Sequence, residues 1–406
     1  MAALHQPRPP APSGPTKSSE RHLSVDALRG FALLGILVVN IKHMSEPFEQ
    51  GWDPYTGEFD KVVRGFVHVF ATFKIFPIFA MLFGYGFQLQ LSRASNDLRP
   101  RYRRRMVGVI VLGALHAVFF FLGDILVLYG LVGLGAYAVR DWPTEKLLRV
   151  AAWIYGITTV FWLVIGALDG KKDDSSTTDS FVEAVTEGSF LDVMLAQAVL
   201  WIPVMLFLFV FQGPVVIASY MIGMAIGRTD WLSNPEAHRN LSGKALRWWP
   251  VGLAIAAFSA WLSLGPTKLD TLGFGVLLIS TPLVAAGWVA IIVRLPANMQ
   301  RLLQPSGRMS LTSYLLESVV AGVLFSAYGF GLIADFSPLG ALGLGVAIWA
   351  GLSVFSHVWM RLFRFGPFEW LLRSYSYAKK QPLRRCRQRT ETISATNRSY
   401  ENPKSV

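Results

Sequence analysis

Long apolar runs separated by short polar segments make up most of this chain. Ten runs approach the length that a helix needs to cross the ~30 Å hydrocarbon core of a bilayer. A membrane β-barrel would instead show short segments of alternating hydrophobicity. The pattern therefore predicts an all-α fold, a polytopic membrane helix bundle with about ten transmembrane helices. The expected spans are residues 27–44, 65–91, 105–122, 124–139, 147–168, 194–227, 248–265, 271–293, 309–329 and 337–360.

The sixth of these spans is unusually long. As one straight helix, residues 194–227 would measure about 50 Å, well beyond the thickness of a bilayer. Pro203 and the sequence Gln212–Gly213–Pro214 interrupt this stretch, and proline disrupts a continuous helix. We therefore expect a kink, or an interfacial piece followed by a single crossing.

Composition supports the membrane class. Hydrophobic residues make up 52% of the 406 residues and charged residues only 16%, and the mean hydropathy is +0.41. A soluble domain of this length rarely combines so little charge with so many long apolar runs.

The net charge of +12 is distributed unevenly over the polar segments. If the N-terminus lies in the cytoplasm, the segments expected inside hold 31 of the 38 Lys and Arg residues, whereas the acid-rich segment 169–188 falls outside. The positive-inside rule therefore predicts that both termini are cytoplasmic. The excess charge orients the protein and attracts anionic phospholipid to its basic loops and tail, so the expected partners are membrane lipids and not nucleic acid. The oligomeric state stays open.

The two ends differ from the membrane domain, which we expect to span residues 21–377. Residues 1–20 are rich in Pro, Ser and Ala, so we expect a disordered arm without a cleavable signal peptide. Residues 378–406 are expected to form a disordered, basic cytoplasmic tail. The single cysteine, Cys386, lies in this tail, which excludes an intrachain disulfide and a thiol nucleophile in the membrane. Because the chain has no metal-ligand cluster, Walker loop or dinucleotide fingerprint, no metal site is expected.

Ionisable side chains within apolar spans carry the functional signal, because they are costly in lipid unless they face a cavity or a partner. In the first span, Asp26, Arg29, Asn40 and His43 fall on steps of three and four residues and so share one stripe. This stripe predicts a polar face turned toward the bundle interior. Alternatively, Asp26 caps the helix and Arg29 extends to the membrane surface.

Further polar residues lie at the same depth as His43, in the outer third of their helices. They are His68 and Lys74 in the second span, His116 in the third, and Asp124 just after it. We expect a polar outer chamber here, although Lys74 could extend outward instead. In a continuous helix His116 and Asp124 would be ~12 Å apart, and we expect Gly123 to end the helix so that the carboxylate can fold back.

A second polar group lies at the inner side, with Arg308, Tyr314 and Glu317 in the segment SGRMSLTSYLLES. Glu317 is about two turns into its helix, where a carboxyl group must be neutral or paired with a cation. Arg308 and Arg29 are the candidate partners for such an ion pair.

Five segments together resemble the YeiB-like family of bacterial inner-membrane proteins, a family defined by a domain of unknown function. They are DALRGFALLGILVVNI, FGYGF, GALHAVFFFLGDILVLYG, SGRMSLTSYLLES and RFGPFEWLLR, and the match runs in order from about residue 21 to 377. The family usually has Gln at the position of Glu317. It is more distantly similar to transmembrane acyltransferases. The resemblance implies a multi-pass protein of the bacterial cytoplasmic (inner) membrane that transfers an acyl group from cytoplasmic acyl-CoA to an acceptor across the membrane, with a histidine as base.

Acyl transfer requires a base near the acceptor and a donor for the developing oxyanion. His116 is the candidate base, unless it only binds a backbone carbonyl of a neighbouring helix, and Asp124 would orient it or bind the acceptor. The candidate substrate-binding residues are Asn40 or Lys74 for the oxyanion, Arg29 and Arg308 for the phosphates of acyl-CoA as co-substrate, and His43, His68, Tyr314 and Glu317. A transporter of a small or lipid-linked molecule and a non-catalytic membrane partner or sensor are the alternatives.

Overall fold

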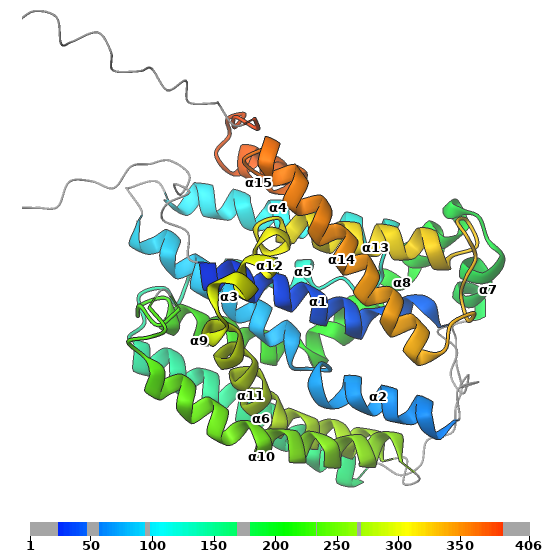
Figure 1. The fold of residues 1–406 in the computed structure, drawn as a ribbon, viewed down its shortest axis with the longest axis horizontal. Coiled ribbons are helices and arrows are strands. Elements are labelled where there is room, and N and C mark those ends of the chain that lie inside the picture. The colour runs from blue at the N-terminus through cyan, green and yellow to red at the C-terminus, as the bar shows by residue number, and fades with distance from the viewer. Residues whose placement is uncertain are drawn as a thin grey trace, which may run out of the picture.

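The protein forms an elongated helical bundle (Figure 1). The computed structural model describes residues 23–46, 57–93, 98–168, 179–232, 234–265 and 269–384. The predicted arm 1–20, most of the acidic segment, and residues 385–406 with Cys386 lie outside the described residues. The helices are α1 (Leu23–Ser45), α2 (Glu58–Phe70), α3 (Ile75–Ser92), α4 (Leu98–Phe119), α5 (Leu126–Ala136), α6 (Thr144–Leu168), α7 (Asp179–Glu187), α8 (Phe190–Phe211), α9 (Gly213–Ile226), α10 (Arg239–Leu264), α11 (Asp270–Arg294), α12 (Ala297–Arg308), α13 (Ser310–Phe325), α14 (Pro338–Leu362) and α15 (Pro367–Ser376).

The fold class predicted from the apolar runs is confirmed. Within the described residues, seven helical segments are long and apolar enough to cross a membrane, with α2 and α3 together forming one of them. The shorter helices α5, α9 and α13 are also apolar. Helix α4 covers most of the span predicted at residues 105–122. The chain is therefore an integral membrane protein with a helical bundle, and the number of ten spans stays a prediction.

The long apolar stretch 194–227 forms two helices that join at Gln212. The Gln212 amide donates to Leu208 at 2.8 Å, and the Val216 amide donates to the Gln212 carbonyl at 2.9 Å. Backbone hydrogen bonds thus continue on both sides of the junction, while Pro214 at the start of α9 has no amide hydrogen to donate. The break expected at residues 212–214 is present, and α8 and α9 form one interrupted element.

Glycines let several helix pairs approach until their backbones touch, among them α3 with α9 and α1 with α12. A Cβ atom on Gly84 of α3 would overlap the carbonyl oxygen of Tyr220 in α9, and one on Gly223 would overlap that of Met81. Helices α1 and α12 cross in the same way, through Gly30 and Gly307. Small residues at such crossings are typical of helix packing in membranes. Packing therefore explains Gly84 of FGYGF and the glycines of the DALRG and SGR segments, but not Gly86, where a Cβ atom would meet only the Arg29 guanidinium at 3.9 Å.

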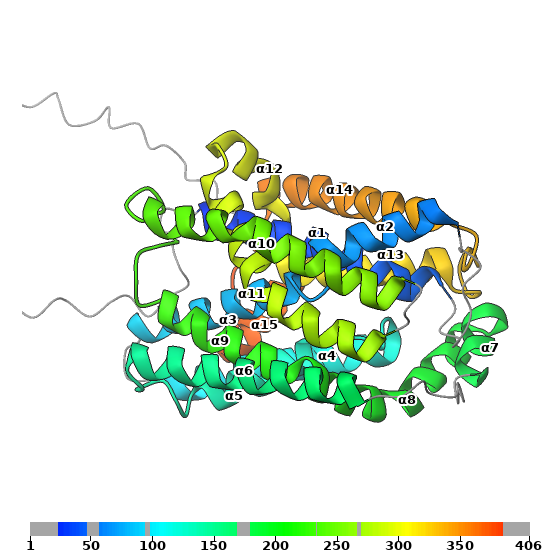
Figure 2. The ribbon, with the colours of Figure 1, turned by 90° about the horizontal axis from the view of Figure 1, so that it is seen from below.

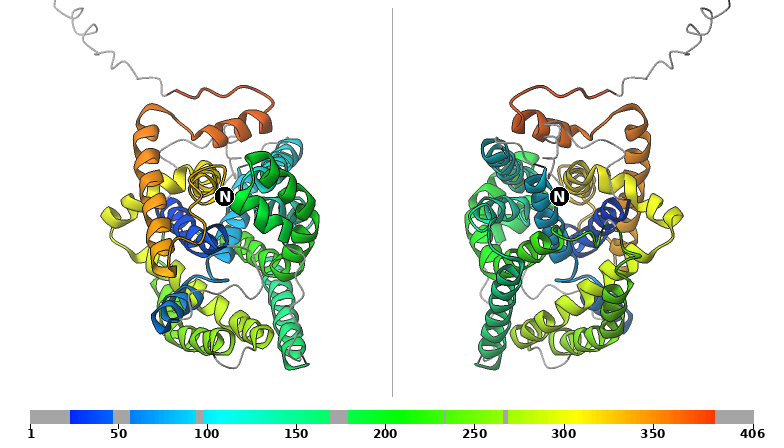
Figure 3. Two further views of the ribbon diagram at one scale, coloured as in Figure 1. Left: turned by 90° about the vertical axis from the view of Figure 1, so that its right-hand side faces the viewer. Right: turned by 90° about the vertical axis from the view of Figure 1, so that its left-hand side faces the viewer.

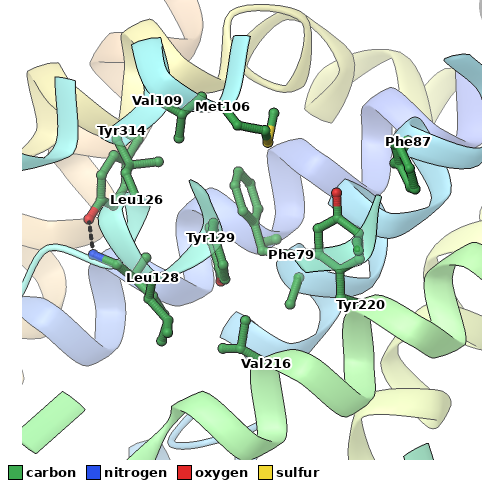
Figure 4. Close-up of a cluster of buried hydrophobic side chains, with 14 of the residues drawn as sticks. Phe79, Phe87, Met106, Val109, Leu126, Leu128, Tyr129, Val216, Tyr220 and Tyr314 are labelled. Carbon is green, nitrogen blue, oxygen red and sulfur yellow. Dashed lines mark hydrogen bonds between the residues drawn. The ribbon is translucent and has the colours of Figure 1, made fainter. Parts of the chain in front are cut away.

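A buried aromatic and aliphatic cluster joins α3, α4, α5, α9 and α13 (Figure 4). Within it, the Tyr102 hydroxyl donates to the Gly133 carbonyl at 3.0 Å and lies 2.8 Å from the Tyr220 hydroxyl. Since Tyr102 uses its hydrogen on Gly133, the Tyr220 hydroxyl is the donor to Tyr102. The hydroxyl groups of Tyr102 and Tyr220 thereby each have a hydrogen-bond partner inside this apolar cluster.

The two ends of the bundle differ in character. One end, which we call the basic end, contains the starts of α1 and α4 together with the amphipathic helices α12 and α15 (Figure 1). Helix α7 lies at the opposite end, which we call the α7 end (Figure 2). Helix α15 lies across the edge of the bundle, between α14 and α4 (Figure 3), and packs on α4, where Arg104 donates to the Ser376 carbonyl at 3.0 Å.

Candidate functional site

The turn between α4 and α5 carries the polar centre of the molecule. The amides of Phe120 and Phe121 both donate to the His116 carbonyl, at 2.9 and 3.0 Å, and the chain then leaves the helix. Asp124 Oδ1 accepts hydrogen bonds from the amides of Leu126 at 2.8 Å and Val127 at 3.2 Å. The carboxylate therefore caps the N-terminus of α5, where the free amides and the helix dipole favour a negative charge.

The same carboxylate contacts His116. Asp124 Oδ2 lies 2.8 Å from His116 Nδ1, and the two residues are 0% and 2% exposed. The turn expected near Gly123 is present and reverses the chain, so the ~12 Å separation of a continuous helix does not occur. The pair is a direct, fully buried hydrogen bond.

The partners of this pair define its protonation. An ionised carboxylate only accepts hydrogen bonds, so Nδ1 carries a hydrogen toward Asp124, and in the neutral imidazole Nε2 then has a free lone pair. His116 Nε2 is buried and has no hydrogen-bond partner within the described residues. Tyr314 completes the arrangement, because its hydroxyl donates to Asp124 Oδ2 at 3.2 Å. The same hydroxyl accepts from the Ile125 amide at 3.4 Å (Figure 4). The ring thus binds Asp124 through Nδ1, not a backbone carbonyl of a neighbouring helix.

A cavity of about 790 Å³ adjoins this turn. Its wall includes Phe120, Phe121, Leu122, Gly123 and Ile125, the residues that connect His116 to α5. The other walls come from α1, the turn between α2 and α3, α3, α7, α8, the α8–α9 junction, α13 and the segment that follows α13. The volume is within the usual range for small-molecule sites. We refer to this space below as the turn cavity.

The residues predicted to form one outer chamber are divided between two places. Asn40 and His43 of α1 line the turn cavity. His68 Nε2 instead lies 2.9 Å from the Ser259 hydroxyl in α10. Lys74 is 0% exposed, and its ammonium donates to the His68 carbonyl at 2.9 Å. A cation at a helix C-terminus stabilises the last carbonyls, so the placement of Lys74 is that of a cap on α2.

The hydrogen of the Ser259 hydroxyl determines the tautomer of His68. This hydroxyl donates to the Gly273 carbonyl at 2.8 Å, so at the His68 contact it can only accept. His68 Nε2 is therefore the donor, and the histidine links α2 to α10 and α11. Neither His68 nor Lys74 is among the residues that line the turn cavity.

Two of the predicted inner residues, Arg29 and Arg308, lie at the basic end, whereas Tyr314 lies at the polar centre beside Asp124. Arg29 pairs with Asp26 at 3.2 Å, and the Arg29 side chain remains 32% exposed. The glycine contact between α1 and α12 brings Arg308, the last residue of α12, to the same end. Glu317 is buried, and its Oε1 has no hydrogen-bond partner in the described part of the chain. Arg29 thus pairs with Asp26 in this structure.

Sequence reasoning missed Glu369. Its carboxylate accepts the amides of Leu311 at 2.7 Å and Thr312 at 3.1 Å and the Thr312 hydroxyl at 2.6 Å. A side chain of α15 thereby caps α13, the helix that carries Tyr314 and Glu317. Burial raises the pKa of the Glu369 carboxyl above its usual value, although the hydrogen bonds from Thr312 and Leu311 act against this rise. The lone glutamate in FGPFEW has no sequence cue for this role, because its partners are more than 50 residues away.

The described residues contain no group of three or more His, Cys, Asp or Glu side chains that could hold a metal ion. The polar centre is a histidine–carboxylate pair supported by a tyrosine and by backbone amides. Such a pair can accept a proton at Nε2, while the carboxylate stabilises the imidazolium that forms.

The chain is similar to one protein family and to relatives that match it over most of their length. The family described as "Protein of unknown function (DUF418)" matches residues 226–379. The "Uncharacterized protein YxaH" of Bacillus subtilis is 30% identical over 413 aligned residues, covering 91% of this chain and 97% of that protein. The "Uncharacterized protein YeiB" of Escherichia coli is 27% identical, covering 89% of this chain and 98% of that protein.

Proposed function

The chain belongs to the YeiB-like family of membrane proteins that contain the DUF418 domain, and we propose that it is a transmembrane acyltransferase. In this proposal it moves an acyl group from acyl-CoA to a hydroxyl or amine that reaches the turn cavity. One observation carries the proposal: the buried His116–Asp124 pair, with an unbonded Nε2, lies next to residues 120–123 and 125, which line a cavity of ligand size, and the pair itself is not among the lining residues.

His116 acts as the general base in the proposed reaction. Nε2 removes the proton of the acceptor hydroxyl or amine as its oxygen or nitrogen attacks the thioester carbon. A tetrahedral intermediate forms, and it collapses when the carbon–sulfur bond breaks. The imidazolium then returns its proton to the departing thiolate, so that free CoA leaves as a thiol and His116 is again neutral. Asp124 stays ionised throughout and stabilises the imidazolium.

Asn40 is the better of the two candidate donors to the oxyanion. Its amide lines the turn cavity, whereas the Lys74 ammonium is bound to the His68 carbonyl. A positioned amide donor typically contributes ~10²–10³ in rate to acyl transfer.

The donor binds at the basic end in this proposal. Arg29 and Arg308 supply charge-assisted hydrogen bonds to the CoA phosphates, and the partial exposure of Arg29 leaves it accessible to a ligand. We place this end in the cytoplasm, where acyl-CoA is made and where anionic phospholipid attracts the basic segments. The membrane is then the bacterial cytoplasmic (inner) membrane.

Acetyl-CoA with a labelled acetyl group tests the proposal. Purified protein, mixed with an extract of envelope lipids and saccharides as acceptor source, should release free CoA and pass label to the extract. His116→Gln keeps a polar side chain but removes the base, and we expect a loss of ~10²–10⁴ in rate. His357→Gln is the matched control, because His357 is exposed on α14 next to Arg361.

Equal CoA release by His116→Gln and the parent protein would remove His116 from the mechanism. Absence of CoA release and of label transfer from the parent protein in every extract would favour the transporter alternative.

A further inference from the structure

We propose that the turn cavity binds an amphiphile from the bilayer, a hydrocarbon chain with a hydroxyl or amine head, which enters sideways past α8. The assignment of this amphiphile as the acyl acceptor rests on the proposed function. The binding itself rests only on the geometry of the cavity.

The cavity wall has the chemistry of a site for a hydrocarbon chain. Of its 29 lining residues, only seven have polar or charged side chains, and six are phenylalanines. Three of the seven polar residues, Asn40, His43 and Glu46, follow one another at steps of three along the end of α1 and the residue after it. A molecule that matches this wall has a long apolar part and a small polar part at one side.

The α7 end of the cavity is covered. Phe181, Val182 and Val185 of α7 line the cavity there. The Ala327 amide donates to the Val185 carbonyl at 3.0 Å, which joins the loop after α13 to α7. Tyr328 of the same loop packs edge-on against Phe190 at 5.2 Å between ring centroids. A bulky hydrophilic acceptor would therefore have to displace this cover to enter from the aqueous phase.

The α8 side of the cavity faces hydrocarbon. Helix α8 is among the segments able to span a membrane, and one of its stripes, Gln197, Leu200, Val204 and Leu208, lines the cavity. Phe207 both lines the cavity and is 54% exposed, so the cavity wall reaches the lipid-facing surface at this helix. Because lipid tails are as apolar as the side chains of the wall, a chain can pass from the bilayer without crossing water.

Gln197, the polar residue on the cavity stripe of α8, has a structural role. In the orientation that satisfies its neighbours, its amide nitrogen donates to the carbonyls of Ala117 at 2.7 Å and Val118 at 3.1 Å. These are carbonyls at the end of α4, which lack helical partners. Gln197 therefore fixes α8 to the His116 turn and leaves the remaining stripe of α8 to contact the chain of the amphiphile.

Photolabelling of the purified full-length protein tests the proposal. The probe is hexadecanol with a diazirine in its chain and a terminal alkyne, and the competitor is plain hexadecanol. We expect competable labelling on the cavity stripe of α8 and on the segment from Phe120 to Ile125. Labelling spread evenly over lipid-facing helices, without competition, would overturn the proposal.

A matched pair of variants sharpens this test. Val204→Trp places a large ring in the cavity, whereas Val199→Trp makes the same change on the lipid-facing side of α8, where Val199 is 76% exposed. We expect Val204→Trp to reduce competable labelling roughly tenfold or more, a change equivalent to ~1.4 kcal/mol, and Val199→Trp to leave it unchanged. Leu200→Phe replaces Val204→Trp if that variant fails to elute as a folded monodisperse protein. Equal labelling of the lining and lipid-facing variants would overturn the proposal.

His116→Gln separates this proposal from the proposed function. The substitution removes the base but not the cavity wall, so labelling should persist. In the parent protein, labelling without any acetyl transfer to hexadecanol would support the lipid site and count against acyl transfer. Acetyl transfer by the parent protein to water-soluble acceptors, without any competable labelling, would support acyl transfer and count against the lipid site.

Discussion

Asp124→Asn tests the central pair most directly, because it removes a charge and preserves the shape of the side chain. Asp124 accepts hydrogen bonds from His116 Nδ1, the Tyr314 hydroxyl and two backbone amides. In the variant, the amide oxygen can still accept from the two backbone amides. The amide nitrogen would then face His116 Nδ1 and the Tyr314 hydroxyl, which are both donors.

This conflict has a defined consequence for His116. The imidazole can relieve it by moving its hydrogen from Nδ1 to Nε2, so that Nδ1 accepts from the new amide. Nε2 then carries a hydrogen and cannot act as a base. The same Asp-to-Asn change in Ser–His–Asp triads lowers kcat by about 10⁴ through the wrong tautomer, equivalent to ~5.5 kcal/mol of transition-state stabilisation. We expect a loss of this order.

The fold should survive the change, since the cap on α5 is kept. The remaining mismatch at the Tyr314 hydroxyl costs ~1–3 kcal/mol if it stays unsatisfied. The assay is the initial rate of CoA release from acetyl-CoA per mole of folded protein, with the thermal midpoint measured in parallel. Asp141→Asn is the matched control, because the Asp141 side chain is 79% exposed.

Two results would refute this reasoning. One is Asp124→Asn protein that folds and transfers acyl groups at the parent rate. The other concerns the double variant Asp124→Asn, His116→Gln. If its loss of rate equalled the product of the two single losses, the residues would act independently, whereas residues that act as one unit give strongly non-additive losses.

Three further predictions follow from the topology and the basic end. In a cysteine-free background, a cysteine at position 175 should react with an impermeant maleimide in intact cells and one at position 394 should not; the reverse pattern would contradict cytoplasmic termini. Arg308→Ala should weaken acyl-CoA binding more than Arg301→Ala on the same helix, whereas unchanged binding with a lower thermal midpoint would assign Arg308 a structural role. The raised pKa of Glu369 means that folding strengthens proton binding, so its contribution to stability is greatest below the unfolded value of ~4.3 and declines as pH rises to the folded value. Glu369→Gln should reduce the change of the thermal midpoint with pH between pH 4.5 and 7. A pH dependence equal to that of the parent protein would contradict this.

Much of the helical architecture was predictable from the sequence, because the length of an apolar run and the position of a proline act locally. Spans such as 27–44 and 271–293 correspond closely to α1 and α11. Depth in the membrane was less predictable: Tyr314, expected at the inner side, contacts Asp124, expected at the outer side. The direction in which a side chain points around the bundle depends on the packing of distant helices.

His68 and His43 illustrate this limit. Both were expected at one depth. His68 of α2 contacts Ser259 of α10, whereas His43 of α1 lines the turn cavity. The hydrogen bond between Tyr314 and Asp124 joins residues 190 positions apart, and no local pattern in either segment contains it. The His116–Asp124 contact was nearer to prediction, because a single turn of the chain creates it.

The backbone-to-backbone crossings of α1 with α12 and of α3 with α9 form a frame that cannot easily change. Helix α8 forms a wall of the turn cavity that can change more freely. A glycine crossing tolerates neither a larger residue nor a shift of one helix along the other, so changes accumulated among relatives must spare it. Helix α8 has no such crossing and contacts the frame through side chains, with Gln197 as one of its anchors. When relatives diverge to use different acceptors, we therefore expect substitutions at the residues of the cavity stripe of α8. The chemistry of the His116 turn should stay the same.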